Sequence, residues 1–306
     1  MEKFITNKIL MVRPICFAYN EETAVNNHYQ KNSNKSGLEI QRQALIEFDN
    51  MVEKLKNNGI DVKILQDTEL PYTPDSIFPN NWFSTHSNNL TILYPMFAKN
   101  RRLERREDIY DFFDNKKEIK ILDYSNLENE NIFLEGTGSL VLDRKNKKAY
   151  CSLSERADER LLDIFCNDMS YKKIAFHSYQ TVKGERKLIY HTNVMMAIAE
   201  NYALICADAI DDANEREKVL DELKNDRKEI IYISEKQVEN FLGNAIELKN
   251  KDNQSILVMS LTAFNSLTVE QKENIEKYSL ILAVDVSTIE EHGGGSARCM
   301  IAELYI

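Results

Sequence analysis

Short apolar runs that alternate with amphipathic stretches constrain the fold of this chain more than any other feature. The runs predict β-strands at 60–65, 90–94, 139–142, 147–153, 172–176, 193–199, 202–207, 229–233, 255–259 and 280–284. Apolar residues at helical spacing predict helices at 38–58, 155–166, 214–224, 235–242 and 269–278. Strand pairs followed by a helix are neither a regular βαβ alternation nor an all-β sandwich. The pattern indicates an α+β array of repeated units, with an irregular mixed-sheet enzyme as the alternative.

Local signals mark where some of these elements end. Gly59 stands at the C-cap of the helix predicted over 38–58, because glycine tolerates a left-handed backbone there. Thr268 and Gln271 have the spacing of a capping box at the start of the last helix. A polar step at 200–201 between two apolar runs predicts a hairpin turn.

The composition limits the partners of the chain. Its 306 residues carry 39 Lys and Arg against 49 Asp and Glu, a formal net charge of −10. Nucleic-acid binding needs a concentrated cationic face, and a net negative charge argues against one. A membrane span needs about 20 apolar residues in a row, and the sequence has no such run. We therefore expect a cytoplasmic protein that binds a small molecule, with neither nucleic acid nor membrane as partner. No polar stretch is long enough to separate domains, so residues 1–306 are expected to form a single domain.

Five cysteines fit neither a disulfide framework nor a paired metal site, because their number is odd and they are scattered. In or beside apolar runs, where a buried thiol is the usual outcome, lie Cys16, Cys151, Cys166 and Cys206. Cys299 differs because it follows three consecutive glycines in HGGGSARCM, residues 292–300. Glycines permit close approach of the backbone to another group. This turn therefore either presents a reactive thiol or is an ordinary tight loop.

Three further motifs carry side chains suited to catalysis. His191 lies where an apolar strand meets a polar step in IYHTNVMMA, and Glu135 lies before a glycine turn in NIFLEGTGSLVL. The segment 74–86, PDSIFPNNWFSTH, crowds Asp75, Asn81 and the only tryptophan around two prolines. A thiol, an imidazole and a carboxylate are the groups that covalent catalysis by an activated cysteine requires. Taken singly, each motif also has a purely structural explanation.

In their order along the chain, these motifs resemble the guanidino-group-modifying superfamily of arginine deiminases, dimethylargininases and amidinotransferases, and within it the citrulline-utilisation hydrolases. The resemblance runs from MVRP at Met11 through FPNNWF, LEGTGS, SLSERAD and YHTNVM to GGGSARC. It implies the pentein fold, an α/β propeller of five ββαβ-like units with pseudo-fivefold symmetry and a central active site. The chain 1–306 would then be a single pentein-fold catalytic domain.

The resemblance also implies catalytic roles. Cys299 would be the nucleophile that attacks the carbon of a guanidinium or ureido group, and His191 would be the general acid and base. Glu135 would hold the substrate nitrogens or support His191. We expect no cofactor, and we expect no metal because the histidines lack HxH or HExxH spacing. The thiolate either exists in the free enzyme or forms when substrate binds.

Substrate-binding residues are implied in the same way. Arg156 in SERAD would make a bidentate contact with the substrate α-carboxylate, and Arg101 or Arg102 would add a second contact. Asp75 is the candidate partner of the substrate ammonium group. The expected ligand is an amino acid, and a homo-oligomer is compatible with the sequence.

Departures from the family pattern bear on the substrate. Asn81 and Asn193 stand where arginine-directed members carry aspartates, and the turn 136–139 lacks the usual following aspartate. An amide cannot replace the charge that stabilises a guanidinium, but it can donate and accept hydrogen bonds with a neutral ureido group. The sequence therefore favours a citrulline ureidase that forms ornithine, ammonia and carbon dioxide through a covalent thio-intermediate.

Other functions stay open at this point. An arginine deiminase or dimethylargininase could rely on Glu135 alone for the guanidinium charge, and an amidinotransferase uses the same cysteine and histidine. From a different class, the chain could be a catalytically silent pentein-fold binding protein, because a fold does not imply an activity.

Overall fold

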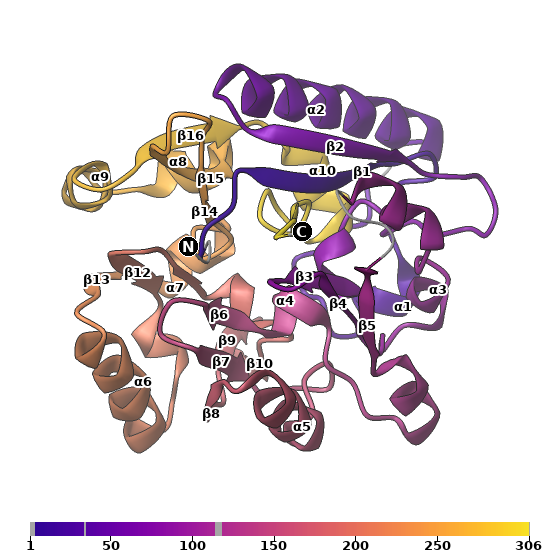
Figure 1. The fold of residues 1–306 in the computed structure, drawn as a ribbon. Coiled ribbons are helices and arrows are strands. Elements are labelled where there is room, and N and C mark those ends of the chain that lie inside the picture. The colour runs from indigo at the N-terminus through magenta and orange to yellow at the C-terminus, as the bar shows by residue number, and fades with distance from the viewer. Residues whose placement is uncertain (1–3, 34, 114–117, 306) are drawn as a thin grey trace.

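Five three-stranded sheets make up most of the structure, a computed structural model that describes residues 4–33, 35–113 and 118–305. Figure 1 shows the sheets following one another around the centre of the molecule. In each sheet the middle strand pairs antiparallel with one neighbour and parallel with the other. One strand arrangement is thus repeated five times, which confirms the predicted α+β propeller of repeated units.

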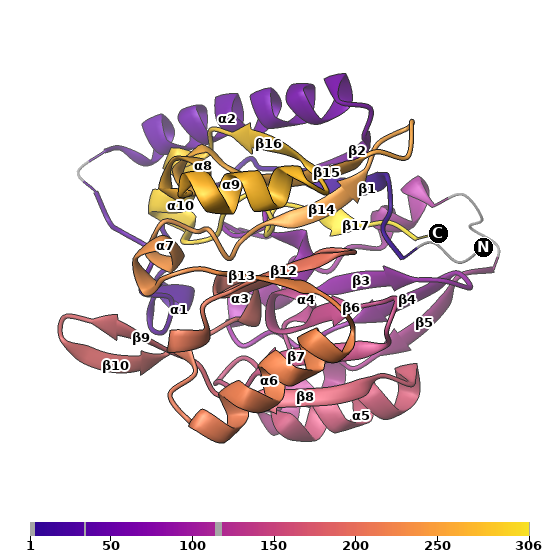
Figure 2. The ribbon, with the colours of Figure 1, turned by 90° about the vertical axis from the view of Figure 1, so that its left-hand side faces the viewer.

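The sheets are named here in their order around the ring. They consist of β17 (Ala302–Glu303), β1 (Lys8–Arg13) and β2 (Asp61–Gln66); β3 (Phe83–His86), β4 (Leu90–Leu93) and β5 (Lys120–Asp123); β6 (Val141–Asp143), β7 (Lys148–Ser152) and β8 (Lys172–Phe176); β11 (Met196–Ile198), β12 (Tyr202–Ile205) and β13 (Glu229–Tyr232); and β14 (Ile246–Lys249), β15 (Ser255–Ser260) and β16 (Leu280–Val284). A separate hairpin of β9 (Tyr179–Val182) and β10 (Glu185–Leu188) projects from one side of the molecule in Figure 2.

The two ends of the chain close the ring. β17 pairs antiparallel with β1, so that Ile9 lies opposite Glu303, and β1 then pairs parallel with β2. The first sheet therefore takes its first strand from the C-terminal end of the sequence. This closure fixes the segment before β17, which contains Cys299, at the centre of the molecule.

Helices connect the second and third strands of the sheets. These crossover helices are α2 (Gly37–Asn57), α5 (Glu159–Met169), α6 (Ala213–Asn225), and the pair α8 (Leu261–Ser266) and α9 (Val269–Glu276). The second sheet has instead the short α3 (Lys99–Arg102) and the 3-10 helix Glu107–Phe112. The predicted signals are confirmed, since Thr268 and Gln271 form a capping box and Gly59 has a φ of 82° just after α2.

The remaining short helices border the centre of the ring. They are α1 (Glu21–Ala24), α4 (Gly136–Ser139), α7 (Glu235–Glu239) and α10 (Ser287–Gly293). Two strand predictions were wrong at their starts because of such turns. Residues 193–194 of the run predicted at 193–199 belong to the 3-10 helix Thr192–Val194, and Ser139 of the run 139–142 ends α4. Strands β5, β9 and β10 escaped prediction because they are short and largely polar.

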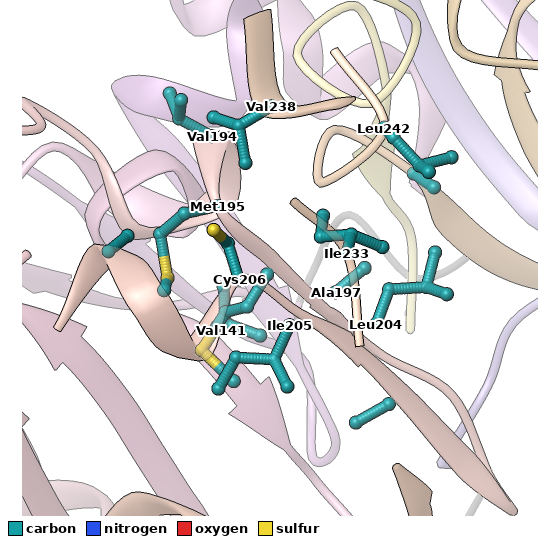
Figure 3. Close-up of a cluster of buried hydrophobic side chains, with 14 of the residues drawn as sticks. Val141, Val194, Met195, Ala197, Leu204, Ile205, Cys206, Ile233, Val238 and Leu242 are labelled. Carbon is teal, nitrogen blue, oxygen red and sulfur yellow. The ribbon is translucent and has the colours of Figure 1, made fainter. Parts of the chain in front are cut away.

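Apolar side chains between sheets and crossover helices form the core. Figure 3 shows part of the largest cluster, in which side chains of β12, such as Leu204 and Cys206 at its end, pack against Val238 and Leu242. Cys151 and Cys166 are also buried, as predicted, whereas Cys16 lies half-buried in a loop. No helix among the described residues is long and apolar enough to cross a membrane.

Candidate active site

Segments that precede the first strand of each sheet supply the polar groups at the centre. They are the 3-10 helix Pro79–Asn81 before β3, Glu135 with α4 before β6, His191 with the 3-10 helix Thr192–Val194 before β11, Asn244 before β14, and the turn 296–300 before β17. Contacts between α4 and the two 3-10 helices, and between Cys299 and both Asn193 and Asn244, bring these five segments together. Residues that are far apart in the sequence thereby share one site.

A cavity of about 270 Å³ lies among these segments. Its lining consists of Thr23, Asn27, Asp75, Phe78, Asn81, Arg101, Arg156, Tyr190, His191, Gly293, Gly295 and Cys299. Glu135 and Asn193 contact these lining residues from behind, through His191 and Cys299 respectively. The structure thus brings every sequence-predicted site residue to one place, except Arg102, whose guanidinium donates to the carbonyls of Met96 and Phe97.

Steric crowding explains why glycine occupies the three positions 293–295 before the cysteine. Helix α10 ends at Gly293, and its C-cap Gly294 has a left-handed φ of 63°. A Cβ atom on Gly293 or Gly295 would come within 2.7 Å or 2.8 Å of the Phe78 ring. The carbonyl of Gly294 accepts a hydrogen bond of 2.9 Å from the Tyr190 hydroxyl. The turn therefore packs tightly against the cavity wall and is not an ordinary loose loop.

Two side-chain amides surround the cysteine sulfur. Asn244 Nδ2 lies 3.1 Å from Cys299 Sγ, and Asn193 Nδ2 lies 3.6 Å from it. Cys299 itself is 5% exposed. Asn244 was not predicted, although Gly243-Asn244 before an apolar strand repeats the setting of Asn81 before β3. An added Cβ on Gly243 would meet the carbonyl oxygen of Val194 at 2.3 Å, so only glycine fits there.

His191 and Glu135 form a buried pair. His191 Nε2 lies 2.8 Å from Glu135 Oε2, and both side chains are at most 3% exposed. Burial lowers the pKa of His191 to about 4, although Glu135 opposes that shift. Burial would raise the pKa of Glu135, but Arg156 and His191 outweigh it and hold that pKa at about 2. At neutral pH the pair is a carboxylate accepting from Nε2–H, which leaves Nδ1 as the proton acceptor.

Asn81 has a fixed orientation. Arg101 Nη1 donates to Asn81 Oδ1 at 2.8 Å, and Glu104 holds Arg101 through its Nε and Nη2 at 2.8 Å and 2.9 Å. Because a guanidinium can only donate, the amide atom facing Arg101 must be the oxygen. Asn81 Nδ2 therefore points away, and it is buried without a partner among the described residues.

The space beside this free amide is occupied by the histidine ring. A Cβ atom on Gly138 would come within 2.3 Å of Asn81 Nδ2 and 2.8 Å of His191 Nδ1. The free donor of Asn81 and the free acceptor of His191 thus border the same small space. Any side chain at position 138 would displace one of them.

Asp75 meets the cavity with one oxygen free. Its Oδ2 accepts from Asn20 Nδ2 at 2.8 Å and from Thr23 Oγ1 at 3.0 Å, whereas Oδ1 is buried without a described partner. Burial raises the pKa of Asp75, and the positive charge of Arg101 opposes this. A carboxylate with an unsatisfied oxygen suits a cationic amino group.

The two arginines depart from their predicted roles. Arg101 has protein acceptors on all three nitrogens, since Nη2 also reaches the carbonyl of Phe78, so it acts on the cavity through Asn81. Arg156 donates from Nε and Nη2 to Asn26 and from Nη2 to the carbonyl of Thr23, while Nη1 lies 3.5 Å from Glu135. A bidentate contact with a substrate carboxylate would have to displace the segment of Thr23 and Asn26.

A comparison with protein families decides the membership of the chain. Residues 13–306 match the sequence profile of N,N-dimethylarginine dimethylhydrolase, eukaryotic. The chain belongs to this dimethylarginine dimethylhydrolase family. The match spans both the glycine turn before Cys299 and the motif of His191, which agrees with the predicted superfamily. Membership in the family supports a hydrolase of guanidino-type carbon–nitrogen bonds in arginine metabolism.

Solved structures agree on the fold of this family member. Apo ArgZ, an arginine dihydrolase from the ornithine–ammonia cycle in cyanobacteria, has a TM-score of 0.72 and 17% identity over 96% of this chain. The N-terminal domain of ArgZ bound to substrate has a TM-score of 0.68 and 16% identity, with 98% of this chain and 99% of that domain covered. A dimethylarginine dimethylaminohydrolase adduct with S-methyl-L-thiocitrulline has a TM-score of 0.62 and 15% identity, with 98% and 100% covered.

The match to full-length ArgZ is partial. The chain spans 40% of that protein, so the family resemblance concerns its N-terminal domain. No protein with curated annotation matches the sequence. These structures support the pentein fold that the motifs predicted.

Proposed function

We propose that this chain is a citrulline ureidase, which hydrolyses citrulline or a close ureido amino acid to ornithine, ammonia and carbon dioxide. The reaction consumes one water per citrulline. The proposal includes a cytoplasmic location, which the five unpaired thiols support.

The observation that carries the proposal is the free N–H of Asn81. Its orientation follows from Arg101, which fixes Oδ1, so the amide offers a donor and no acceptor beside His191. A ureido oxygen can accept this hydrogen bond. A guanidinium has only donors and would leave the buried Nδ2 of Asn81 unsatisfied, at a cost of about 1–3 kcal/mol.

The charges around the cavity also favour a neutral reacting group. Glu135 is the carboxylate nearest to the histidine, and its charge is already balanced by Arg156 and by the hydrogen bond from His191. Asn193 offers its Oδ1, buried without a described partner, as an acceptor for a ureido N–H. Two amides in place of carboxylates recognise a group that is polar but uncharged.

The proposed first step forms a bond between Cys299 and the substrate. The thiolate sulfur attacks the ureido carbon, and the electron pair moves onto the ureido oxygen, which Asn81 Nδ2 stabilises. The intermediate then collapses, one carbon–nitrogen bond breaks, and the departing nitrogen takes a proton that His191 Nδ1 has first bound from solvent. The carbon remains bound to sulfur as a thiocarbamate.

In the second step, water releases the carbon. Neutral His191 accepts a proton at Nδ1 from a water that attacks the thiocarbamate carbon, and Glu135 stabilises the imidazolium that forms. The carbon–sulfur bond breaks and regenerates the thiolate. The carbamic acid so produced loses carbon dioxide, and the remaining nitrogen is released as an amine or as ammonia.

The closest alternative is a guanidino substrate such as arginine or dimethylarginine, which the family description favours. We test the two by incubating the purified protein separately with citrulline and with arginine and measuring ornithine, citrulline and ammonia. The proposal expects ornithine and one ammonia per citrulline. Conversion of arginine without turnover of citrulline contradicts it. An added glycine acceptor that yields a new guanidino product would reveal an amidinotransferase.

A variant at Asn81 tests the carrying observation directly. Asn81→Asp removes the free N–H and adds a charge, so citrulline turnover should fall by about 10- to 100-fold, corresponding to about 1.5–3 kcal/mol. The guanidino alternative expects improved arginine turnover from the same variant. Asn57→Asp, at an exposed position at the end of α2, is the matched control and should change neither rate.

A further inference from the structure

Asn244 contacts the reacting sulfur more closely than any sequence-predicted residue does. Its Nδ2 lies 3.1 Å from Cys299 Sγ and 3.2 Å from the carbonyl of Asn193. Asn244 is 2% exposed, and it reaches the centre from the segment before β14, between the sheets that hold His191 and Cys299. The motifs that imply the other catalytic roles do not include it.

We propose that Asn244 is a catalytic residue whose side-chain amide donates to Cys299 Sγ and stabilises the thiolate before substrate binds. Asn193 supplies a second and weaker donor at 3.6 Å. Among the described residues, these two amides are the hydrogen-bond donors at the sulfur. The nucleophile is thus supported by an amide pair and does not require an imidazolium partner.

The orientation of the Asn244 amide is fixed by the backbone. Its Oδ1 accepts from the N–H groups of Arg298 and Cys299, at 3.1 Å and 3.4 Å. These backbone groups can only donate, so the oxygen must face them and the NH₂ group must face the sulfur. The same side chain therefore positions the turn of the nucleophile and hydrogen-bonds its sulfur.

Other charges around the sulfur do not replace this contact. The ionisable side chains that line the cavity with Cys299 are Asp75, Arg101, Arg156, Tyr190 and His191, and Glu135 lies behind His191. Arg101 and Arg156 are bound to carboxylates or carbonyls, and Arg298, the neighbour in the chain, turns away to Glu303. Burial keeps His191 neutral at pH 7, so it adds no cation.

The test is the rate of iodoacetamide alkylation of Cys299 against pH, without substrate, in the full chain. The inference rests on the cysteine chemistry of the proposed function but not on the identity of the substrate. The role of Asn244 and the choice of citrulline can therefore be refuted independently. In the wild type the midpoint should lie below the ordinary thiol range near 8.5. It should rise by about one pH unit or more in Asn244→Asp, which retains the oxygen that accepts from the backbone but adds a charge. It should rise also in the uncharged Asn244→Ala, where only the loss of the amide can raise it.

Turnover should fall together with that shift, by about 10²-fold, because a donor to the reacting anion is lost. Asn193→Ala should shift the midpoint less, since its contact is longer. A purely structural role for Asn244 would lower the melting temperature and the turnover while leaving the midpoint unchanged, and that result overturns the proposal. If Asn244→Asp fails to fold, Asn244→Ala replaces it, and a wild-type midpoint at or above 8.5 overturns the proposal by itself.

Discussion

Two cavities differ in how their buried polar groups are paired, one beside Cys299, here called the catalytic end, and one beside Lys228, here called the far end. At the catalytic end, Asp75 and Asn81 each leave a buried side-chain atom without a partner among the described residues. The far end holds a second cavity of about 690 Å³, lined among others by Lys228 and Glu303. There Lys228 binds Asp143 at 3.0 Å, and Glu303 accepts from Arg298 at 3.2 Å.

This difference in pairing indicates which polar groups are available to bind a ligand and which stabilise the fold. Buried polar atoms are normally satisfied, so atoms left free at one end indicate a ligand that supplies the missing partners. At the other end the charged side chains pair with one another and stabilise the ring of sheets, and among the described residues Asn193 Oδ1 is the free atom that also borders that cavity. This contrast favours the smaller cavity as the place of the proposed chemistry.

Removal of the nucleophile is the most severe way to test this comparison. Cys299→Ser should lower turnover by about 10⁴-fold or more, because a hydroxyl is a far weaker nucleophile than a thiolate at neutral pH. Covalent labelling by a haloacetamidine probe should be lost as well. Cys16→Ser, at the half-buried thiol outside the cavity, is the control and should leave turnover and labelling intact. Retained activity in Cys299→Ser would refute the assignment.

A methyl group at Gly138 should have the next largest effect. In Gly138→Ala the new Cβ would collide with Asn81 Nδ2 and His191 Nδ1, at 2.3 Å and 2.8 Å, and so misplace both. We expect turnover to fall by about 10²-fold, as small displacements of catalytic groups do. Gly37→Ala, where an added Cβ meets nothing within 4 Å, should have no such effect. Turnover measured at saturating citrulline decides the outcome.

A variant at the far end should change stability and leave catalysis almost unchanged. Lys228→Ala removes the cationic partner of the Asp143 carboxylate, whose side chain is 2% exposed and then keeps only the neutral donors of Asn146. The change should cost about 3 kcal/mol of unfolding free energy. Turnover per folded molecule should stay within about twofold of wild type. Lys145→Ala, which breaks a half-exposed ion pair at the same cavity, should cost under about 1 kcal/mol. A strong loss of turnover in Lys228→Ala would show that the far end takes part in catalysis.

Acid should destabilise the catalytic end, with the smallest effect of this series. The unfolded chain binds a proton on His191 below about pH 6.5, whereas the folded protein does so only near pH 4. Stability is thus lost as pH falls from 6.5 to 4, and the loss through Glu135 follows between about 4.5 and 2. Melting temperatures at pH 7 and 4.5 should differ by a few degrees less in His191→Gln than in wild type. His177→Gln, at a surface pair with Glu215, is the control.

Much of the fold was predictable because its signals are local. The apolar runs of β8 and β16, the helical spacing in α2 and the capping box of α9 depend on residues close in sequence. Strand β10 could not be predicted from the sequence, because all four of its residues are exposed and no apolar alternation marks it. Strand β17 is only two residues long and exists through its pairing with β1 across nearly the whole chain.

The sequence by itself determined the chemical groups of the site. The glycine turn before Cys299, the motifs of His191 and Glu135, and the amides at Asn81 and Asn193 are readable as residue types. Only the tertiary structure decided what those groups can do. It turned Arg101 from a substrate contact into the residue that orients Asn81, and it brought Asn244 to the sulfur. The reason is physical, since hydrogen-bond direction depends on which partners the closed ring of sheets brings within reach, and residue type alone does not fix it.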